Sequence, residues 1–216
     1  MIQRILSPND RLKQDPLDDS IFYASPRFVY HLDIGFRKRL KSLYKEYVKP
    51  DSILLDLMSS WVSHLPEKVN YTKVIAHGMN EKELKANPRI DQYWVQDLNK
   101  HQAIQLSDNS IDYCLIAAGW QYLQEPEHVA SEIKRILRTN GLLIVSFSDR
   151  AFWQKSPKIW LESSSENRLA YISNILTSQG WPQPILINEE QTNSSPLPFF
   201  YRQGDPFYSV IATNKK

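Results

Sequence analysis

Short apolar runs that alternate with helical patterns are the feature that most constrains how this chain can fold. Five of them are candidate strands: residues 52–57, 74–78, 93–98, 111–118 and 141–148. A strand that is apolar along its whole length is buried on both faces, which is typical of a parallel sheet covered by helices on both sides. Residues 184–190 and 206–214 read as two later strands. No helical pattern joins these last two, which favours antiparallel pairing.

Three segments have the spacing of amphipathic helices, with apolar residues three and four positions apart. They are residues 28–48, 126–141 and 166–179, and we expect Gly141 and Gly180 to follow the ends of the last two. Residues 1–27, which are polar and rich in proline, read as a loosely docked arm. We predict an α/β fold: a three-layer Rossmann-like sandwich whose mostly parallel seven-stranded sheet has one reversed strand near the edge.

Composition excludes several other classes. The chain has 216 residues, of which 42% are hydrophobic, which suits a soluble domain with a sizeable core. No apolar run is long enough to cross a bilayer, and no secretory signal opens the chain. Cys114 is the single cysteine and lies inside a predicted strand, so we expect a buried thiol, no internal disulfide and a cytoplasmic location. No His/Cys spacing indicates a metal site, and the interspersed charges argue against nucleic-acid or membrane partners.

The tract from residue 106 to 149 carries a specific resemblance. It reads LSDNSIDYCLIAAGWQYLQEPEHVASEIKRILRTNGLLIVSFSD. This tract is similar to the corresponding one of the class I methyltransferases that use S-adenosylmethionine. The resemblance extends over about residues 28–214. It implies S-adenosylmethionine as the cofactor, bound at the carboxyl ends of the strands. With this resemblance, residues 1–216 read as one methyltransferase-like domain. Its expected parts are an N-terminal arm with a capping helix (1–50), a cofactor-binding half (51–150) and a C-terminal half with a substrate-side loop (151–216).

The first cofactor loop departs from the family. The family pattern Asp-x-Gly-x-Gly-x-Gly reads here Asp56-Leu57-Met58-Ser59-Ser60-Trp61-Val62, so the acid remains and the three glycines are replaced. Two outcomes are open, because glycine lets the backbone approach a ligand. Either the loop keeps its path and binds the cofactor through Met58, Ser59 and Ser60, or the pocket is altered. The segments MSSWVSH and GMN also resemble a methyltransferase-like subfamily of undefined substrate, in which this loop is the regular form.

The family's other cofactor contacts follow the second and third strands. Gly78 stands where the family places an acid for the ribose hydroxyls, with Asn80 and Glu81 close by as substitutes. Met79 could pack on the adenine. Asp97, with Leu98, matches the position that accepts from the adenine amino group. Each of these residues also has a purely structural alternative: an N-cap role for Asp56, core packing for Met79 and an exposed turn for Asp97.

Candidate catalytic residues are two histidines. His31 lies on the predicted first helix and His64 follows the cofactor loop, so both could face one pocket and take a proton from an acceptor. The alternative for each is a structural histidine. We expect His77 and His101 at the surface, and His128 solvated at the start of a helix.

Substrate-side candidates lie in the arm and near the strand ends. Arg27 could meet a carboxylate, including that of the cofactor's methionine part. Trp61, Trp120 and Arg150 could line a substrate pocket or serve only as packing and surface residues. The loop 191–205 could be a lid, a substrate collar or a dimer contact.

These observations lead to a primary hypothesis and an alternative. The primary hypothesis is an S-adenosylmethionine-dependent methyltransferase acting on an unidentified small molecule, as a monomer or homodimer. The alternative is a non-catalytic binding or assembly module whose cofactor loop is degenerate. A nicotinamide enzyme is disfavoured because no G-x-G-x-x-G follows the first strand.

Overall fold

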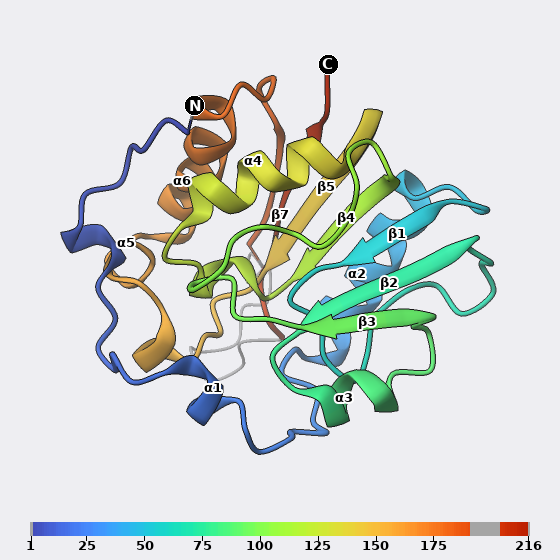
Figure 1. The fold of residues 1–216 in the computed structure, drawn as a ribbon, viewed down its shortest axis with the longest axis horizontal. Coiled ribbons are helices and arrows are strands. Elements are labelled where there is room, and N and C mark those ends of the chain that lie inside the picture. Colours follow the sequence, from blue (N-terminus) through green and yellow to red (C-terminus); the bar gives the residue numbers. More distant parts are fainter. Residues whose placement is uncertain (1, 191–203, 216) are drawn as a thin grey trace, which may run out of the picture.

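A mixed seven-stranded sheet lies at the centre of the computed structural model, which describes residues 2–190 and 204–215 (Figure 1). Its strands are β1 (Ile53–Asp56), β2 (Lys73–Gly78), β3 (Gln92–Val95), β4 (Ile111–Ala117), β5 (Leu137–Phe147), β6 (Ile185–Glu189) and β7 (Phe207–Thr213). Their order is β3-β2-β1-β4-β5-β7-β6. Strands β1 to β5 pair in parallel, and β7 is antiparallel to both β5 and β6. The predicted reversed strand near the edge is therefore confirmed.

Helices cover both faces of the sheet. They are α1 (Asp19–Phe22), α2 (Ile34–Tyr47), α3 (Glu81–Ala86), α4 (Pro126–Ile136), α5 (Lys158–Leu161) and α6 (Ser165–Ser178). In Figure 1, α4 and α6 lie in front of the sheet and α2 lies behind it. Alternate residues of β4 separate into the two cores: Tyr113 and Leu115 pack with α2, whereas Cys114 and Ile116 pack with α4 and α6. This period of two, repeated across the sheet, makes the three layers.

Two helix boundaries differ from the prediction. Helix α2 begins at Ile34, not at Phe28, because the Asp33 carboxylate accepts from the Phe36 amide (2.7 Å) and caps the helix there. Helix α4 ends at Ile136, so Gly141 is not its C-terminal glycine and lies within β5. Gly180, with a φ of +76°, does follow α6 as expected.

The connection between β1 and β2 contains no helix. Residues 57–72 cross from one strand to the next as irregular backbone. This segment contains serine, tryptophan, valine and histidine. All four residue types form helices less readily than alanine or leucine. The Asn87 side chain fixes the segment instead, donating to the Ser60 carbonyl (3.0 Å) and to the Ser63 hydroxyl (2.9 Å). The alternative role of Asp56 as an N-cap is therefore excluded.

The N-terminal arm is docked through buried ion pairs, which corrects the expectation that it is loose. The Arg11 guanidinium donates to both carboxylate oxygens of Glu127, at 2.8 and 3.0 Å, and the Glu127 side chain is fully buried. Farther along the arm, the buried ammonium of Lys155 contacts Asp15 (2.9 Å) and Asp19 (3.3 Å). Charges buried in this way hold their segments in place because separating them would leave an uncompensated charge.

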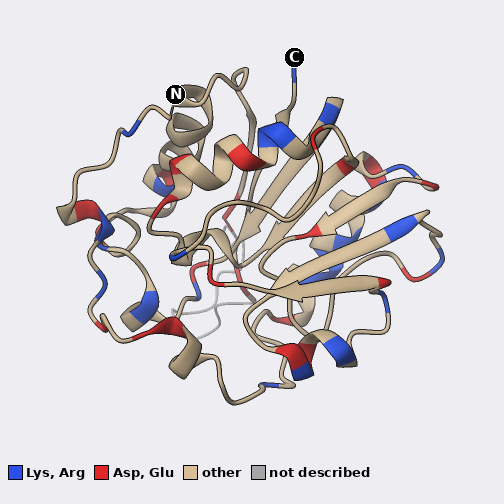
Figure 2. Ribbon diagram, in the orientation of Figure 1, with Lys and Arg blue, Asp and Glu red and all other residues tan. Residues whose placement is uncertain are grey.

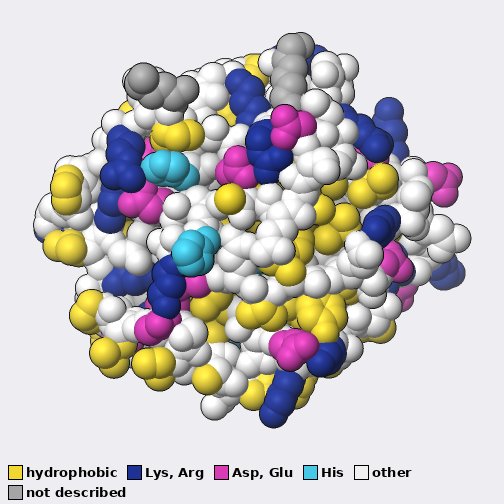
Figure 3. Space-filling model, viewed as in Figure 1, with side chains coloured by type: hydrophobic (Ala, Val, Ile, Leu, Met, Phe, Trp, Pro, Cys, Tyr) yellow, Lys and Arg dark blue, Asp and Glu magenta, His cyan; other side chains and the backbone are white. Residues whose placement is uncertain are grey.

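Charges of both signs are distributed over the molecule. Figure 2 shows basic and acidic residues on helices, strands and loops alike, and the face in Figure 3 carries them side by side, with apolar side chains between. The described part of the chain contains no helix long and apolar enough to span a membrane. The Cys114 thiol is buried, as expected, and burial raises its pKa well above the ordinary value.

Candidate cofactor and acceptor site

A cavity of about 420 Å³ opens at the carboxyl ends of the parallel strands, where open α/β sheets bind ligands. Its volume lies within the range of small-molecule sites. Of the predicted site residues, those that line it are Arg27, His31, Asp56, Met58, Ser59, Ser60, Trp61, His64, Gly78, Met79, Asn80, Asp97, Leu98 and Arg150. Trp120 is not among them. It is 1% exposed and packs in the core with α4 and α6, so its position gives it no contact with a ligand in this cavity.

The glycine-free loop after β1 keeps a sharp turn. Met58, at the position of the first family glycine, adopts a φ of +61°, which is uncommon for a residue with a side chain. Three hydrogen bonds hold the turn. The Met58 amide donates to His77 Nδ1 (3.2 Å), the Ser59 amide to the His77 carbonyl (2.6 Å), and the Ser59 hydroxyl to Asp56 Oδ2 (2.6 Å). The surrounding structure thus compensates the backbone strain.

Glycines on the neighbouring strands leave room for this loop. A Cβ atom on Gly78 would lie 2.5 Å from the Ser59 carbonyl oxygen, and one on Gly119 would lie 2.7 Å from the Met58 Cβ. Both distances are shorter than atoms can approach without displacement. The loop side chains therefore fit because the ends of β2 and β4 have no side chain there, and the cavity stays open. An acid at position 78 would therefore displace the loop.

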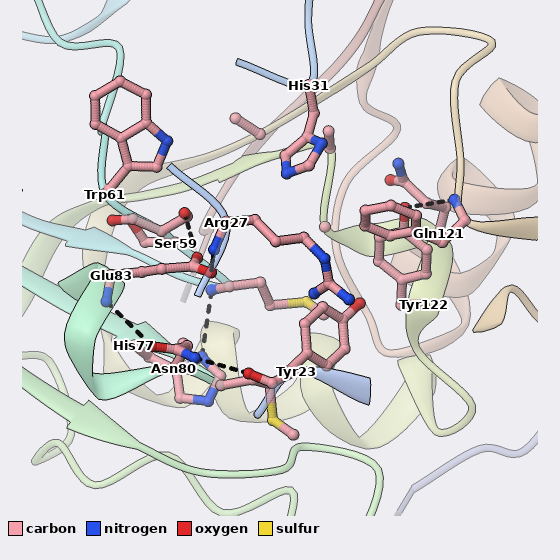
Figure 4. Close-up of a pocket in the computed structure, with 18 of the residues that line it drawn as sticks. Tyr23, Arg27, His31, Ser59, Trp61, His77, Asn80, Glu83, Gln121 and Tyr122 are labelled. Carbon is pink, nitrogen blue, oxygen red and sulfur yellow. Dashed lines mark hydrogen bonds between the residues drawn. The ribbon is translucent and has the colours of Figure 1, made fainter. Parts of the chain in front are cut away.

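His77 is a buried structural group, which corrects its predicted place at the surface. It is 1% exposed, its Nδ1 accepts from the Met58 amide, and its Nε2 lies 2.9 Å from the Gln96 carbonyl (Figure 4). A carbonyl can only accept, so Nε2 carries the proton and the ring is neutral. Burial lowers the pKa of His77 to about 4, and the hydrogen bond to Gln96 opposes that shift.

The stability of the protein should show the titration of His77. Its pKa is near 4 when folded and has an ordinary value of 6.5, so between these pH values only the unfolded chain takes up a proton. The stability that this group contributes is present above about pH 6.5 and is lost as the pH falls towards 4. We expect the variant His77→Asn to show a shallower loss in the free energy of unfolding over this range, measured by urea titration.

At pH 8 the His77 ring is neutral in both the folded and the unfolded protein. The difference in the free energy of unfolding between variant and wild type at that pH therefore gives the effect of the substitution without titration of His77. His64 is present in both proteins and burial also lowers its pKa to about 4, so it contributes the same slope to each. A decline in the variant as steep as in the wild type would contradict the assignment of the slope to His77.

Asp56 lies beneath the loop, 4% exposed at the end of β1. Burial raises its pKa to about 6, and hydrogen bonds from Ser59 and Ser63 partly offset the shift. The Asp56 carboxylate thus orients the loop through its hydrogen bond from Ser59. When ionised, it also places a negative charge at the floor of the cavity.

The segment after β2 contributes an amide, Asn80, and an acid, Glu83, to the cavity. The Asn80 side chain caps α3 and donates to the carbonyls of Tyr23 (2.8 Å) and Ala24 (3.1 Å), so it ties the arm to the sheet. Glu83, one turn farther, accepts from the Ser60 hydroxyl (2.5 Å) and from the Arg27 amide (2.7 Å). Glu83, and not the exposed Glu81, is the acid beside Gly78 that lines the cavity.

Asp97 follows β3. It is half-buried, and its Oδ1 accepts from the Asn99 amide (2.8 Å). This bond fixes the carboxylate at the cavity wall beside the buried Leu98.

The two candidate histidines line the same cavity from different elements. His31 is exposed at its mouth and stacks edge-on against Phe152, with ring centroids 5.3 Å apart. Partial burial lowers the pKa of His31, and the charge of Arg27 adds to the effect. His64 is more deeply placed, near Arg37 and Lys41, which also lower its pKa.

The opposite end of the cavity, beyond β4 and β5, is aromatic and basic. The Arg27 guanidinium lies over the rings of Phe22, Tyr23 and Phe152, at 4.5, 5.9 and 5.5 Å from their centroids. In Figure 4 its side chain crosses the cavity between Tyr23 and His31, towards Tyr122. Arg150, which is exposed, pairs with Asp205 (2.6 Å).

Four residues of the site escaped the sequence analysis: Glu83, Gln121, Phe152 and the structural His77. A signal existed for Glu83, because Asn80 is a helix N-cap and an acid three residues later is typical of a helix start. A signal existed for His77 as well, since it interrupts an apolar run whose neighbours are all buried. Gln121 follows β4 within a short 3-10 helix (Trp120–Tyr122), and Phe152 follows β5 just before another (Trp153–Lys155). Neither segment is long enough to show a pattern that points inward. The predicted loop 191–205 lies outside the described residues except for its last two.

Comparisons with known proteins agree with this geometry. Residues 59–145 match a family described as a methyltransferase domain, and no curated protein sequence matches the chain. Among solved structures, a methyltransferase from Thermotoga maritima superposes with a TM-score of 0.58 at 18% identity, covering 84% of this chain and 90% of that one. A methyltransferase from Archaeoglobus fulgidus gives 0.58 at 13%, covering 82% and 94%.

A third solved structure contains the cofactor. It is phosphoethanolamine N-methyltransferase 2 of Haemonchus contortus in complex with S-adenosyl-L-methionine, with a TM-score of 0.57 at 14% identity, covering 84% of this chain and 53% of that one. At such identities a structural likeness establishes the fold alone, and the domain match covers residues 59–145. Together they are consistent with the class I superfamily of S-adenosylmethionine-dependent methyltransferases.

Proposed function

We propose that the chain is an S-adenosylmethionine-dependent methyltransferase that acts on a small molecule held at the β4 and β5 side of the cavity. The observation that carries this proposal is the open cavity above a glycine-free loop, made possible by Gly78 and Gly119. The side chains that replace the glycines do not fill the site. The cavity therefore has room for the family's cofactor on the β1–β3 side and for an acceptor on the β4–β5 side.

The residues present fit S-adenosylmethionine. Asp97, Leu98 and Glu83 line the cavity. In this proposal Asp97 accepts from the adenine amino group, and the Glu83 carboxylate accepts from two neighbouring ribose hydroxyls. Met79 and the Met58–Ser60 turn provide the walls. When bound, this cofactor supplies a sulfonium methyl group that a nucleophile attacks in line, with the carbon–sulfur electrons staying on sulfur.

The chain's own part in the chemistry is to orient the acceptor and to take up its proton. His31 faces the acceptor side, and its lowered pKa keeps the imidazole in the free-base form at neutral pH. It would receive the proton that an acceptor hydroxyl or amine loses. His64 lies nearer α2 and serves as a second candidate for the same role.

Calorimetric titration with S-adenosylmethionine and S-adenosylhomocysteine tests the proposal. We expect saturable micromolar binding of both. Millimolar or absent affinity for both ligands, in a folded protein, would reject the enzyme and favour the non-catalytic binding module, which the loss of the loop glycines and of the usual ribose acid would then explain.

Replacing Asp97 by alanine should weaken S-adenosylhomocysteine binding by about 1–3 kcal/mol, because the adenine amino group would lose a partly buried hydrogen-bond partner. The measurement is the same titration, with thermal unfolding as the check on folding. The matched control is Asp108→Ala, which removes a 67%-exposed carboxylate far from the cavity and should leave the affinity unchanged. Equal affinity in Asp97→Ala and wild type would remove Asp97 from the adenine site.

A further inference from the structure

The Arg27 guanidinium is a feature of the cavity that the proposed cofactor does not account for. Within the described residues it donates a single hydrogen bond, from Nη2 to the Phe22 carbonyl (2.8 Å), and forms no ion pair. A guanidinium has five N–H donors, and three aromatic rings fix the plane of this one. Most of its donors therefore remain available to a ligand.

The acids of the same cavity already have partners. Asp19 contacts Lys13 (2.5 Å) and Lys155 (3.3 Å), and Glu83 accepts from Ser60 and from the Arg27 backbone. Asp97 accepts from the Asn99 amide. None of these acids is a counter-ion of Arg27, so the geometry suits an anion supplied from outside the chain.

The position of the guanidinium separates it from the cofactor's half of the site. The Arg27 amide is anchored on Glu83 at the β2 side, but the side chain reaches Phe152, which follows β5. His31 and Arg150 are the other basic groups at that end, and Arg150 Nη1 lies 3.4 Å from the His31 carbonyl. This end is therefore basic and aromatic, whereas the β1–β3 end is acidic.

A second side chain at this end has a polar atom without a hydrogen-bond partner among the described residues. Gln121 is 1% exposed and lines the cavity, its Nε2 lies 3.4 Å from the Arg150 carbonyl, and its Oε1 has no hydrogen-bond partner in the described chain. A buried acceptor without a donor is rare in folded proteins. It indicates that a ligand with an N–H or O–H group completes the site.

We propose that the acceptor is a small carboxylic acid with an apolar body, whose carboxylate pairs with Arg27 between the rings of Phe22, Tyr23 and Phe152. This assignment rests on the proposed function for the site as a whole. A planar guanidinium matches a carboxylate through two parallel hydrogen bonds, and the rings exclude water from the pair. Gln121 then accepts from a polar hydrogen of the same molecule, and the acceptor atom lies on the His31 side.

The test uses three probes that share a phenyl ring and a one-carbon substituent but differ in charge: benzoate, benzyl alcohol and benzylamine. Each is titrated into the protein with saturating S-adenosylhomocysteine, and again without it, so that failure of cofactor binding does not conceal the result. We expect benzoate to bind at least tenfold more tightly than benzyl alcohol, and benzylamine no more tightly than benzyl alcohol. Tighter binding of benzylamine, or equal binding of all three, would overturn the proposal.

Variants of Arg27 separate an acceptor role from a cofactor role. Arg27→Leu should weaken benzoate at least tenfold, and Arg27→Lys should recover part of the loss, while S-adenosylhomocysteine and 5′-methylthioadenosine keep their wild-type affinities within twofold. Arg4→Leu, which changes a 60%-exposed arginine paired with Glu125, is the matched control and should change none of them. If Arg27→Leu weakens S-adenosylhomocysteine but not 5′-methylthioadenosine, Arg27 holds the cofactor's own carboxylate and the proposal is wrong.

Discussion

Replacing Glu127 by alanine should lower the free energy of unfolding by about 3–5 kcal/mol, the range for removing one partner of a buried ion pair. The Glu127 carboxylate accepts from the amides of Ile5 and Leu6, each at 3.1 Å, and from both terminal nitrogens of Arg11. Burial alone would raise the pKa of Glu127, but the bonds from Arg11 and Leu6 more than offset it, so the pKa lies below its ordinary value. Alanine would leave the 10%-exposed Arg11 side chain with Glu125 as its acidic partner (3.4 Å) and with the carbonyls of Gln124 and Leu6.

Urea unfolding at neutral pH measures this effect, and limited proteolysis within residues 2–18 reports whether the arm is released. The matched control is Glu67→Ala, because the Glu67–Lys41 pair is exposed (80% and 37%) and should contribute less than about 1 kcal/mol. Glu127→Gln keeps the acceptor oxygen for the two amides and should cost less than alanine. A loss below about 1 kcal/mol in Glu127→Ala would show that the pair does not hold the arm.

Restoring the family's usual acid, by the substitution Gly78→Asp, should impair the site. The new Cβ would lie 2.5 Å from the Ser59 carbonyl oxygen and 3.2 Å from Leu84 Cδ2. The carbonyl belongs to a turn that His77 and Asp56 hold in place, so relief requires the whole turn to move. We expect a loss of about 1–3 kcal/mol in stability, as for other overpacked sites. S-adenosylhomocysteine should bind at least tenfold more weakly, although a carboxylate has been added.

Gly78→Ala separates the effect of the Cβ atom from that of the charge and should produce most of the loss. Gly35→Ala is the control, because its Cβ would lie 3.3 Å from Asp33 Oδ1 at the start of α2, and alanine favours helix by up to about 1 kcal/mol. Unfolding and calorimetry on the four proteins decide the matter. Wild-type stability together with tighter binding in Gly78→Asp would mean that the loop is free to adopt the family's usual path.

Much of the fold could be predicted because it depends on repeating patterns. The strands of the parallel sheet, the burial of β1, β2, β4 and β5, and the antiparallel β6–β7 pair all follow from apolar periodicity and connection length. The edge strand β3 has no buried residue, contrary to the expected burial. Boundaries were less accurate where a single polar contact decides them. The cap from Asp33 makes α2 begin at Ile34, where periodicity predicts Phe28. Strand β5 begins at Leu137, four residues before the predicted start at Gly141. The arm was misjudged because the partners of Arg11 and Lys155 are distant in sequence.

The site was predictable only as far as the family resemblance extended. Asp56 and Asp97 stand at strand ends, so their place at the cavity follows from the strand assignment. Glu83 lines the cavity from α3, one turn beyond Gly78, and Gln121 and Phe152 reach the cavity from short segments after β4 and β5. No spacing rule connects such residues, because their neighbours in the site come from other strands.

The amino-acid sequence alone determined the order of strands and helices, the reversed strand and the resemblance to methyltransferases, since hydrophobic periodicity and a long gapless tract record them directly. The tertiary structure alone decided whether a cofactor loop without glycines can exist. That outcome depends on the space opposite each loop atom, which Gly78 and Gly119 provide, and on the hydrogen bonds from His77 that hold Met58 in a left-handed turn. Such distances arise between segments that meet only after the chain has folded.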